Sequence, residues 1–184
     1  MLKTEELSKL TSWLDKYPLF HSSDEVDEVR HKVGHIFVPH NLNVLGQEKH
    51  LSADMNHLQL ENVSVNTLGY GASVNITCDP FEKFLLIMLP MTGVMDATVE
   101  EGVVNANKGT AALINTSDPL SMKWGENCNQ LIIRIDKELI HRTYQQLKLF
   151  PTPNYKNLVI SVCGIGVNKE FSLVITDAVP DLQL

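Results

Sequence analysis

The stretch Phe84-Leu85-Leu86-Ile87-Met88-Leu89-Pro90-Met91-Thr92-Gly93 decides the fold class of this chain. Its apolar run stops at Pro90, which makes it too short to cross a bilayer, since a membrane-spanning helix needs ~20 apolar residues. Thr92-Gly93 is a turn signal, and another short, partly apolar run follows from Val94 to Val99. The sequence therefore predicts two β-strands here, separated by a turn.

Short runs of this kind recur from Val63 onward at intervals of about ten residues, the usual rhythm of a β-sandwich or barrel. Turn residues such as Asp79-Pro80 and Lys108-Gly109 separate them. A closed or nearly closed barrel is the favoured arrangement of so many short strands, because closure removes exposed strand edges. The expected strands are Val63–Tyr70, Ala72–Thr77, Lys83–Leu89, Val94–Val99, Val103–Ala106, Thr110–Asn115, Leu120–Trp124 and Gln130–Ile135.

Three segments have helical periodicity instead: Glu5 to Tyr17, Asp24 to Ile36, and Asp136 to about Leu149. Ser22 to Glu25 is typical of a capping box at the start of the second helix. After the third helix, Leu158 to Cys163 indicates another strand, and Glu170 to Ala178 fits either a strand or a helix. The fold class expected from the whole pattern is mainly β with flanking helices (α+β).

Composition describes one globular domain over residues 1–184. The chain has 15 Lys and Arg against 22 Asp and Glu, a formal charge of −7, with 43% hydrophobic residues. This acidic balance argues against binding of a phosphate backbone by the chain itself. Cys78, Cys128 and Cys163 are odd in number and far apart, which favours reduced thiols and a cytoplasmic location. No targeting segment or membrane span is expected.

The sequence motifs that could indicate cofactor binding, metal binding or catalysis are incomplete. Gly164-Ile165-Gly166 has Lys169 where a dinucleotide loop needs its third glycine. His31 and His35 lie one helical turn apart, but opposite the valine stripe, where a solvated face is a better interpretation than a metal site. Cys128 is expected near the surface and without a catalytic role. We therefore expect no catalytic residue, no metal and no cofactor.

Several blocks together resemble a known family. They are Phe20-His21-Ser22-Ser23-Asp24, Val38-Pro39-His40-Asn41-Leu42, Leu68-Gly69-Tyr70-Gly71-Ala72-Ser73-Val74, Leu86 to Gly93, Asn107 to Asn115 and Asn127 to Asp136 with the helix after it. In order and spacing, the stretch from Phe20 to Leu147 resembles the N-terminal, cupin-like ligand-binding domain of AraC/XylS-type transcriptional regulators.

The resemblance implies a single jelly-roll barrel that binds a small effector, helices that dimerise, and a helix-turn-helix DNA-binding half. Nothing here resembles a recognition helix, so DNA contact is expected only through a C-terminal domain absent from this chain. The regulatory domain then divides into N-terminal helices (1–40), the barrel (60–135), and a helix with a C-terminal segment (136–184).

The expected function is effector sensing and homodimerisation, not catalysis, with an effector that is partly apolar or aromatic. Tyr70 and Trp124 fit a plain core equally well, His40 could cap a loop, and Arg134 could pair with an acidic residue. Residues expected to bind the effector are His40, Tyr70, Phe84, Leu86, Met88, Met122, Trp124 and Arg134. Residues expected at a dimer interface, unless they pack on the barrel, are Leu139, Ile140, Tyr144 and Leu147.

Two alternatives remain open. The barrel could be a ligand-free dimerisation or protein-interaction scaffold, in which case its interior would be packed solid. It could also be a cupin-type metal enzyme, but such a site needs histidines that project inward from the barrel strands. No histidine lies between His57 and His141, so this third possibility is disfavoured.

Overall fold

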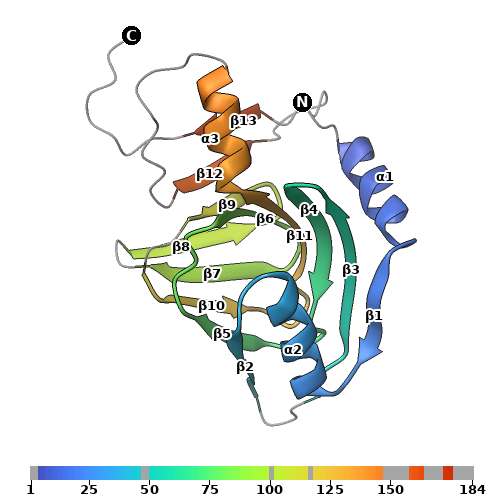
Figure 1. The fold of residues 1–184 in the computed structure, drawn as a ribbon. Coiled ribbons are helices and arrows are strands. Elements are labelled where there is room, and N and C mark those ends of the chain that lie inside the picture. The colour runs from blue at the N-terminus through green and yellow to red at the C-terminus, as the bar shows by residue number, and fades with distance from the viewer. Residues whose placement is uncertain are drawn as a thin grey trace.

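The computed structural model describes residues 4–46, 50–99, 102–115, 118–146, 158–163 and 172–175, with no side chains described at 4–8, 99, 144, 158–163 and 172–175. These residues form two antiparallel sheets that face each other, with three helices around them (Figure 1). The architecture is the mainly β, cupin-like barrel that the sequence predicts.

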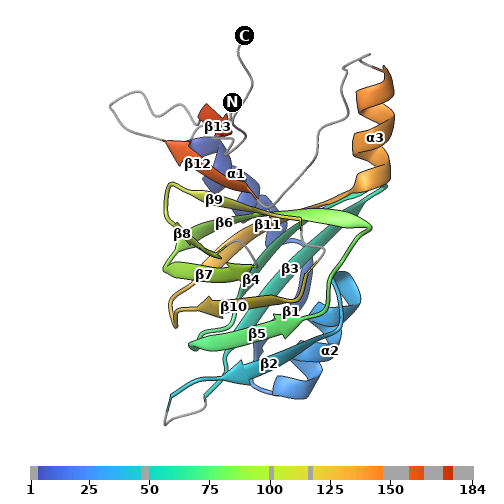
Figure 2. The same ribbon diagram turned by 90° about the vertical axis from the view of Figure 1, so that its left-hand side faces the viewer.

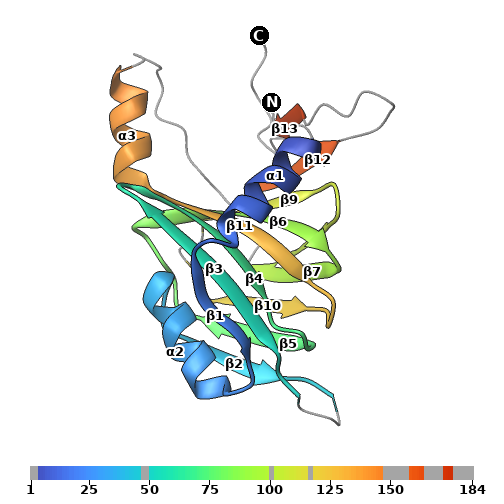
Figure 3. The ribbon, with the colours of Figure 1, turned by 90° about the vertical axis from the view of Figure 1, so that its right-hand side faces the viewer.

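Each sheet can be seen face-on. Figure 3 shows the eight-stranded sheet, with strands in the order β1 Pro18–Ser23, β3 Ala53–Leu60, β4 Val63–Gly69, β11 Asn129–Asp136, β6 Phe84–Thr92, β9 Ala111–Ile114, β12 Leu158–Cys163 and β13 Ser172–Ile175. Figure 2 shows the five-stranded sheet, in the order β2 His40–Val44, β5 Val74–Cys78, β10 Leu120–Trp124, β7 Val94–Val99 and β8 Gly102–Asn107.

The three helices take different places around the sheets. The helix α2, Val26–Ile36, lies between β1 and β2 and covers the open side where the two sheets part (Figure 1). Its buried residues Val29 and Val33 face the interior. The helix α1, Thr4–Leu14, packs on β3 and β4, and α3, Lys137–Gln146, continues directly from β11.

The sequence pattern misses three strands, β1, β2 and β3, all before Val63. Their stretches are short or rich in His, Asn and Asp, and the strands are held by their neighbours. From Asp54 to Leu60, β3 pairs with β4, and β2 pairs along its whole length with β5. The expected capping box is also wrong, because the N-cap of α2 is Glu25 and makes no side-chain cap hydrogen bond. The third helix is expected to run to about Leu149, and its expected residues 147–149 lie outside the described part of the chain.

The strand β6 is buried on both faces, which explains its unbroken apolar sequence. Its inward residues Phe84, Leu86 and Met88 belong to the main core between the sheets. On the other face, Leu85 joins a second, smaller apolar cluster that includes Leu113 of β9. A strand with one solvated face would show polar residues at every second position, and β6 shows none from Phe84 to Leu89.

Gly93 makes the expected turn after β6 and has a structural reason to be glycine. Its φ is +70°, and a Cβ added to it would lie 2.6 Å from the backbone nitrogen and Cα of Cys128. Backbone atoms at that distance cannot give way cheaply, so the turn holds the β10–β11 connection close against β6.

Replacement of this glycine should therefore be costly. We expect Gly93→Ala to lower the free energy of unfolding by about 2–3 kcal/mol, and Gly46→Ala by only about 1 kcal/mol. Gly46 is the matched control, since its φ is also positive, +99°, but an added Cβ meets nothing within 4 Å. Urea denaturation of both variants measures the difference, and equal losses would contradict the role assigned to the close contact.

Candidate functional site

The space between the two sheets contains a small cavity of about 40 Å³. Its lining comes from β2, β4, β5, β6, β10 and β11, with the end of α2 and the residues after it, and it includes no Asp, Glu, Lys or Arg. Of the residues that the sequence predicts for effector binding, the wall brings together His40, Tyr70, Phe84, Leu86, Met88, Met122 and Trp124. Effector binding by these seven residues stays a prediction.

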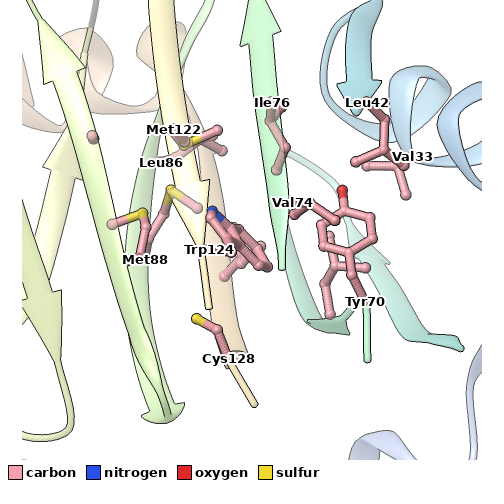
Figure 4. Close-up of a cluster of buried hydrophobic side chains, with 14 of the residues drawn as sticks. Val33, Leu42, Tyr70, Val74, Ile76, Leu86, Met88, Met122, Trp124 and Cys128 are labelled. Atoms are coloured by element: carbon pink, nitrogen blue, oxygen red, sulfur yellow. The ribbon is translucent and has the colours of Figure 1, made fainter. Parts of the chain in front are cut away.

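Strand periodicity explains why these residues meet. On β10 the buried positions alternate, so Leu120, Met122 and Trp124 all point inward. Phe84, Leu86 and Met88 do the same on β6, which faces β10 across the barrel (Figure 4). Alternate apolar residues on two facing strands are the sequence signal for this wall.

Tyr70 and Trp124 form an aromatic pair at one end of the cavity. Their ring centroids are 5.3 Å apart in a T-shaped arrangement, and each side chain is 2% exposed. In Figure 4 the Tyr70 hydroxyl points toward Val33, and the indole nitrogen of Trp124 lies toward Met88 and Met122. Burial raises the pKa of Tyr70 well above its usual value, so the hydroxyl keeps its proton.

His40 lies at the other end of the strands and has one engaged and one free ring nitrogen. Its Nδ1 is 2.9 Å from the carbonyl oxygen of Val38. A carbonyl can only accept a hydrogen bond, so Nδ1 carries a proton. Burial lowers the pKa of His40, against the effect of this hydrogen bond, and the charge of Arg30 lowers it further. The ring is therefore neutral near pH 7, and its Nε2 is an acceptor.

The cavity adjoins a much larger open hollow of about 750 Å³ on the outside of the barrel. Three residues line both spaces: His40, Cys78 and Leu120. They face one another in register across β2, β5 and β10, so they form one row of side chains at the strand ends. Burial, together with the neighbouring charge of Asp79, raises the pKa of the Cys78 thiol to about 11, which keeps it protonated. This row separates the cavity from the hollow.

Arg134, the eighth predicted residue, is not part of the cavity wall. Its guanidinium carbon lies 4.4 Å from the ring centroid of Phe84, and its Nη2 is 3.0 Å from the carboxylate of Asp136. Phe84 in turn stacks on Phe81, with ring centroids 4.7 Å apart. In this structure Arg134 therefore holds one aromatic wall of the cavity in place and has an acidic partner.

A buried polar network on the inner face of β3 and β4 does not follow from the sequence analysis. Asn66 is fully buried, and its Oδ1 accepts a hydrogen bond from Nδ1 of His57 at 2.6 Å. Its Nδ2 donates to Ser64 Oγ and to the carbonyl oxygen of Ile132, both at 3.1 Å. Ser64 and Asn66 alternate with valines along β4 and occupy its buried positions. Polar residues at these alternate positions are the sequence signal that could have indicated the network.

The residues expected at a dimer interface have mixed placements. Ile140 packs on the second apolar cluster, beside Leu85 and Leu113, so it contacts the barrel of its own chain. Leu139 is partly exposed on α3. The side chain of Tyr144 and all of Leu147 lie outside the described residues. Dimerisation through these four residues stays a prediction.

The structure also places the histidines and the cysteine that were considered as metal ligands or reactive groups. Among the described residues, no three His, Cys, Asp or Glu side chains gather closely enough to hold a metal ion. His31 and His35 are both exposed on α2. The expectation that Cys128 is near the surface is wrong, because it is 1% exposed. It lies in the connection between β10 and β11, just before β11, with its side chain in the core. Burial raises the pKa of its thiol to about 11.

Comparison with known proteins identifies the family. The family model described as the AraC-binding-like domain matches residues 29–155, more than half of the chain. The chain therefore belongs to the AraC-binding-like domain family, whose members are regulatory ligand-binding domains, and the resemblance given by the sequence blocks is confirmed. No curated protein matches the chain.

Solved structures show a similar fold. The chain is similar to the AraC-like transcriptional activator CuxR, at 9% identity and a TM-score of 0.50, over 59% of this chain and 43% of that one. It is also similar to the cupin domain of Cnp3 from Schizosaccharomyces pombe, at 14% identity and a TM-score of 0.40, over 61% of this chain and 79% of that one. This chain thus spans less than half the length of the activator.

Among the described residues, no helix is long and apolar enough to span a membrane.

The buried position of His40 predicts a specific pH dependence of stability. Because its pKa is lowered in the folded protein from the ordinary value of 6.5, the unfolded chain binds more protons at this residue. Its contribution is therefore complete above the unfolded pKa and is lost as the pH falls toward the folded one. We expect His40→Asn to flatten the decrease in unfolding free energy as the pH falls below about 7.

Asn retains a donor for the Val38 carbonyl but does not titrate, and His35→Asn on the exposed face of α2 is the matched control. Urea denaturation at a series of pH values measures the effect. Parallel pH profiles for wild type and His40→Asn would contradict it.

The hydrogen bonds of Asn66 predict a large loss of stability when its side chain is truncated. Asn66→Ala should lower the free energy of unfolding by about 2–4 kcal/mol, because it leaves buried polar partners unsatisfied and a void behind. Asn105→Ala removes an exposed hydrogen bond to Asp96 and should cost less than about 0.5 kcal/mol. Thermal or urea unfolding of both variants tests this, and similar losses would show that the network is not a stabilising one.

Proposed function

We propose that this chain is the effector-sensing and dimerisation domain of an AraC-type transcriptional regulator, and that it binds a small organic molecule inside the barrel. The regulator then contacts DNA through a helix-turn-helix half outside this chain, in the cytoplasm, and the chain itself performs no catalysis. A ligand that binds two arrangements of the domain with different affinity shifts the population between them, and the attached half responds to that shift.

One observation carries the proposal: the cavity between the sheets lies behind a single row of side chains that also borders an open hollow. Ligand sites in proteins are concave and mostly apolar, with a few polar groups that orient the ligand. The wall of this cavity has that composition, since His40, Tyr70 and Trp124 are its aromatic residues with polar atoms. The row of His40, Cys78 and Leu120 is then the entrance.

Residues 29–155 match a family of regulatory ligand-binding domains, which supports the same conclusion. The net negative charge of the chain fits a regulator in which a separate, basic domain binds the phosphate backbone of DNA. Dimerisation would use the exposed part of α3, where Leu139 is accessible, with Tyr144 and Leu147 further along the same segment.

The size of the cavity favours a second candidate function. About 40 Å³ is room for one or two water molecules, whereas benzene occupies a cavity of about 150 Å³. A barrel that never widens beyond this would be a ligand-free scaffold whose partners are proteins. The two candidates differ in whether the side chains that line the cavity move aside for a ligand.

A cavity-filling substitution distinguishes them. Val33→Ile adds one methylene group to a residue that lines the cavity and is 3% exposed. Val103→Ile, the matched control, adds the same group at a site on β8 that is 60% exposed. We expect Val33→Ile alone to raise the free energy of unfolding by up to about 0.8 kcal/mol, the value of one buried methylene group.

A thermal-shift screen of small organic molecules then compares wild type with both variants. The proposal predicts compounds that stabilise wild type and Val103→Ile but lose their effect on Val33→Ile. Compounds that stabilise all three proteins equally, or no stabilising compound at all, would contradict effector binding in the barrel and favour the scaffold.

A further inference from the structure

One nitrogen atom deep in the cavity wall is buried and has no hydrogen-bond partner among the described residues. It is Nε1 of Trp124, whose side chain is 2% exposed. An indole Nε1 can only donate a hydrogen bond. Most buried polar side-chain atoms in proteins have a partner, because an unpaired one loses the hydrogen bonds it would make to water. This N–H group is therefore available to an acceptor that enters the cavity.

The surroundings of this nitrogen are apolar. In Figure 4 it lies toward the side chains of Met88 and Met122, while the hydroxyl of Tyr70 points away from it, toward Val33. Methionine sulfur is only a weak acceptor. A buried water molecule usually makes about three hydrogen bonds, so a water beside Nε1 of Trp124 would be poorly held and easily displaced by a ligand.

Trp124 lies at the end of the barrel strands that is opposite the row of His40, Cys78 and Leu120. In the register of the sheet, Trp124 pairs with Val74, whereas Leu120 pairs with Cys78 and Cys78 with His40. Leu120 and Trp124 are four residues apart on β10, which corresponds to roughly 13 Å of extended strand. The unpartnered Nε2 of His40 therefore belongs to the entrance row and shares no partner atom with Nε1 of Trp124.

This placement gives a ligand a direction. A molecule that enters past the row of His40, Cys78 and Leu120 reaches Trp124 last, so its leading end meets the indole N–H and its body lies against the apolar wall. Met88 and Met122 line that wall, and methionine side chains adapt to different neighbours more readily than branched ones. A ligand with one small ring then fits after these side chains rearrange.

The leading group of such a ligand follows from the chemistry of the wall. No Asp, Glu, Lys or Arg lines the cavity, so a carboxylate or ammonium group would lose its hydration without gaining a counter-ion, which is costly. A hydroxyl group would bring a donor of its own, to which the methionines beside Nε1 offer only weak acceptors. A carbonyl oxygen accepts and brings no donor, so it suits the N–H of Trp124 best.

We propose that the effector of this domain is an uncharged, mainly apolar carbonyl compound, such as a ketone or an ester, whose oxygen accepts a hydrogen bond from Nε1 of Trp124. Its apolar body lies between Trp124 and the entrance row. This inference rests on the proposed function and names the chemical class of its effector. Alcohols and organic acids of the same size bind more weakly.

Nitrogen-15 NMR of the whole chain tests this, because Trp13 and Trp124 are its two tryptophans and each gives one indole N–H signal. Trp13 lies on α1 and is 40% exposed, so it is an internal control. The probes are cyclohexanone, cyclohexanol, cyclohexane and cyclohexanecarboxylate, which share one six-membered ring and differ in the polar group. Cyclohexanone should move the Trp124 proton signal downfield in a saturable way and leave the Trp13 signal unchanged.

The four affinities should follow the chemistry of the wall. Cyclohexane should bind roughly 2- to 10-fold more weakly than cyclohexanone, which is the range for one net hydrogen bond. Cyclohexanol should also bind more weakly than cyclohexanone, because its donor is poorly satisfied. Cyclohexanecarboxylate should leave the Trp124 signal unchanged at the same concentrations.

A substitution separates the hydrogen bond from the shape of the cavity. Trp124→Phe keeps an aromatic ring but removes the N–H, so it should remove the preference for cyclohexanone over cyclohexane. A loss of stability or a wider cavity affects both compounds, so the ratio of their affinities is the quantity to measure, from the methionine methyl signals. Trp13→Phe is the matched control and should keep the preference.

Each contrary result has a separate meaning. Cyclohexanol or cyclohexanecarboxylate that binds as tightly as cyclohexanone overturns the ligand class and leaves effector binding in the barrel intact. A preference for cyclohexanone that persists in Trp124→Phe overturns the role of Nε1. No saturable response of Trp124 to any of the four probes also overturns the inference. The proposed function is then decided independently, by whether any compound in the thermal-shift screen is lost on Val33→Ile.

Discussion

The pairing of β6 with β11 is the constraint on which the rest of this structure depends. The two strands lie side by side over eight pairs of residues, from Phe84 with Asp136 to Thr92 with Asn129, in the middle of the eight-stranded sheet. A register shift of one residue would exchange the inward and outward sides of β6. Leu86 and Met88 would then leave the cavity wall, and Leu85 would leave the cluster on which α3 packs through Ile140. The interior and the helical side of the barrel are thus positioned by the same ladder.

This arrangement gives the interior the character that the proposed effector site needs, an apolar wall without charged groups. Both sheets contribute apolar side chains at alternate positions, so the few polar atoms between them are isolated and directional. Trp124 and His40 have that character, whereas the polar network around Asn66 is internally satisfied and serves stability. The distinction separates polar groups that hold the barrel together from those available to a ligand. A regulatory domain needs both, since the barrel has to persist while its contents change.

Much of the fold and of the cavity wall could be predicted from the sequence. Strong periodicity over β6, β10 and β11 identified their strands, and alternation placed Met122 and Trp124 on the same side. The strands β1, β2 and β3 could not be predicted, because pairing with neighbours rather than local apolar pattern holds them extended. Arg134 shows a different limit: the sequence leaves open whether it binds an effector or pairs with an acidic residue, and the structure shows the pair with Asp136 on the same strand. Its contact with the Phe84 ring could not be predicted, because it depends on the pairing of β6 with β11. The depth of Cys128 was missed because a polar loop carries it into the core.

The central claim is that the barrel encloses an apolar cavity that a small molecule can enter from outside. Crystallography of the protein under xenon pressure tests this most directly, because xenon is apolar and enters dry protein cavities. The account predicts a xenon atom inside the barrel, in contact with Leu86, Met88 and Met122. Xenon bound at the surface alone, with the barrel interior unchanged, would contradict it.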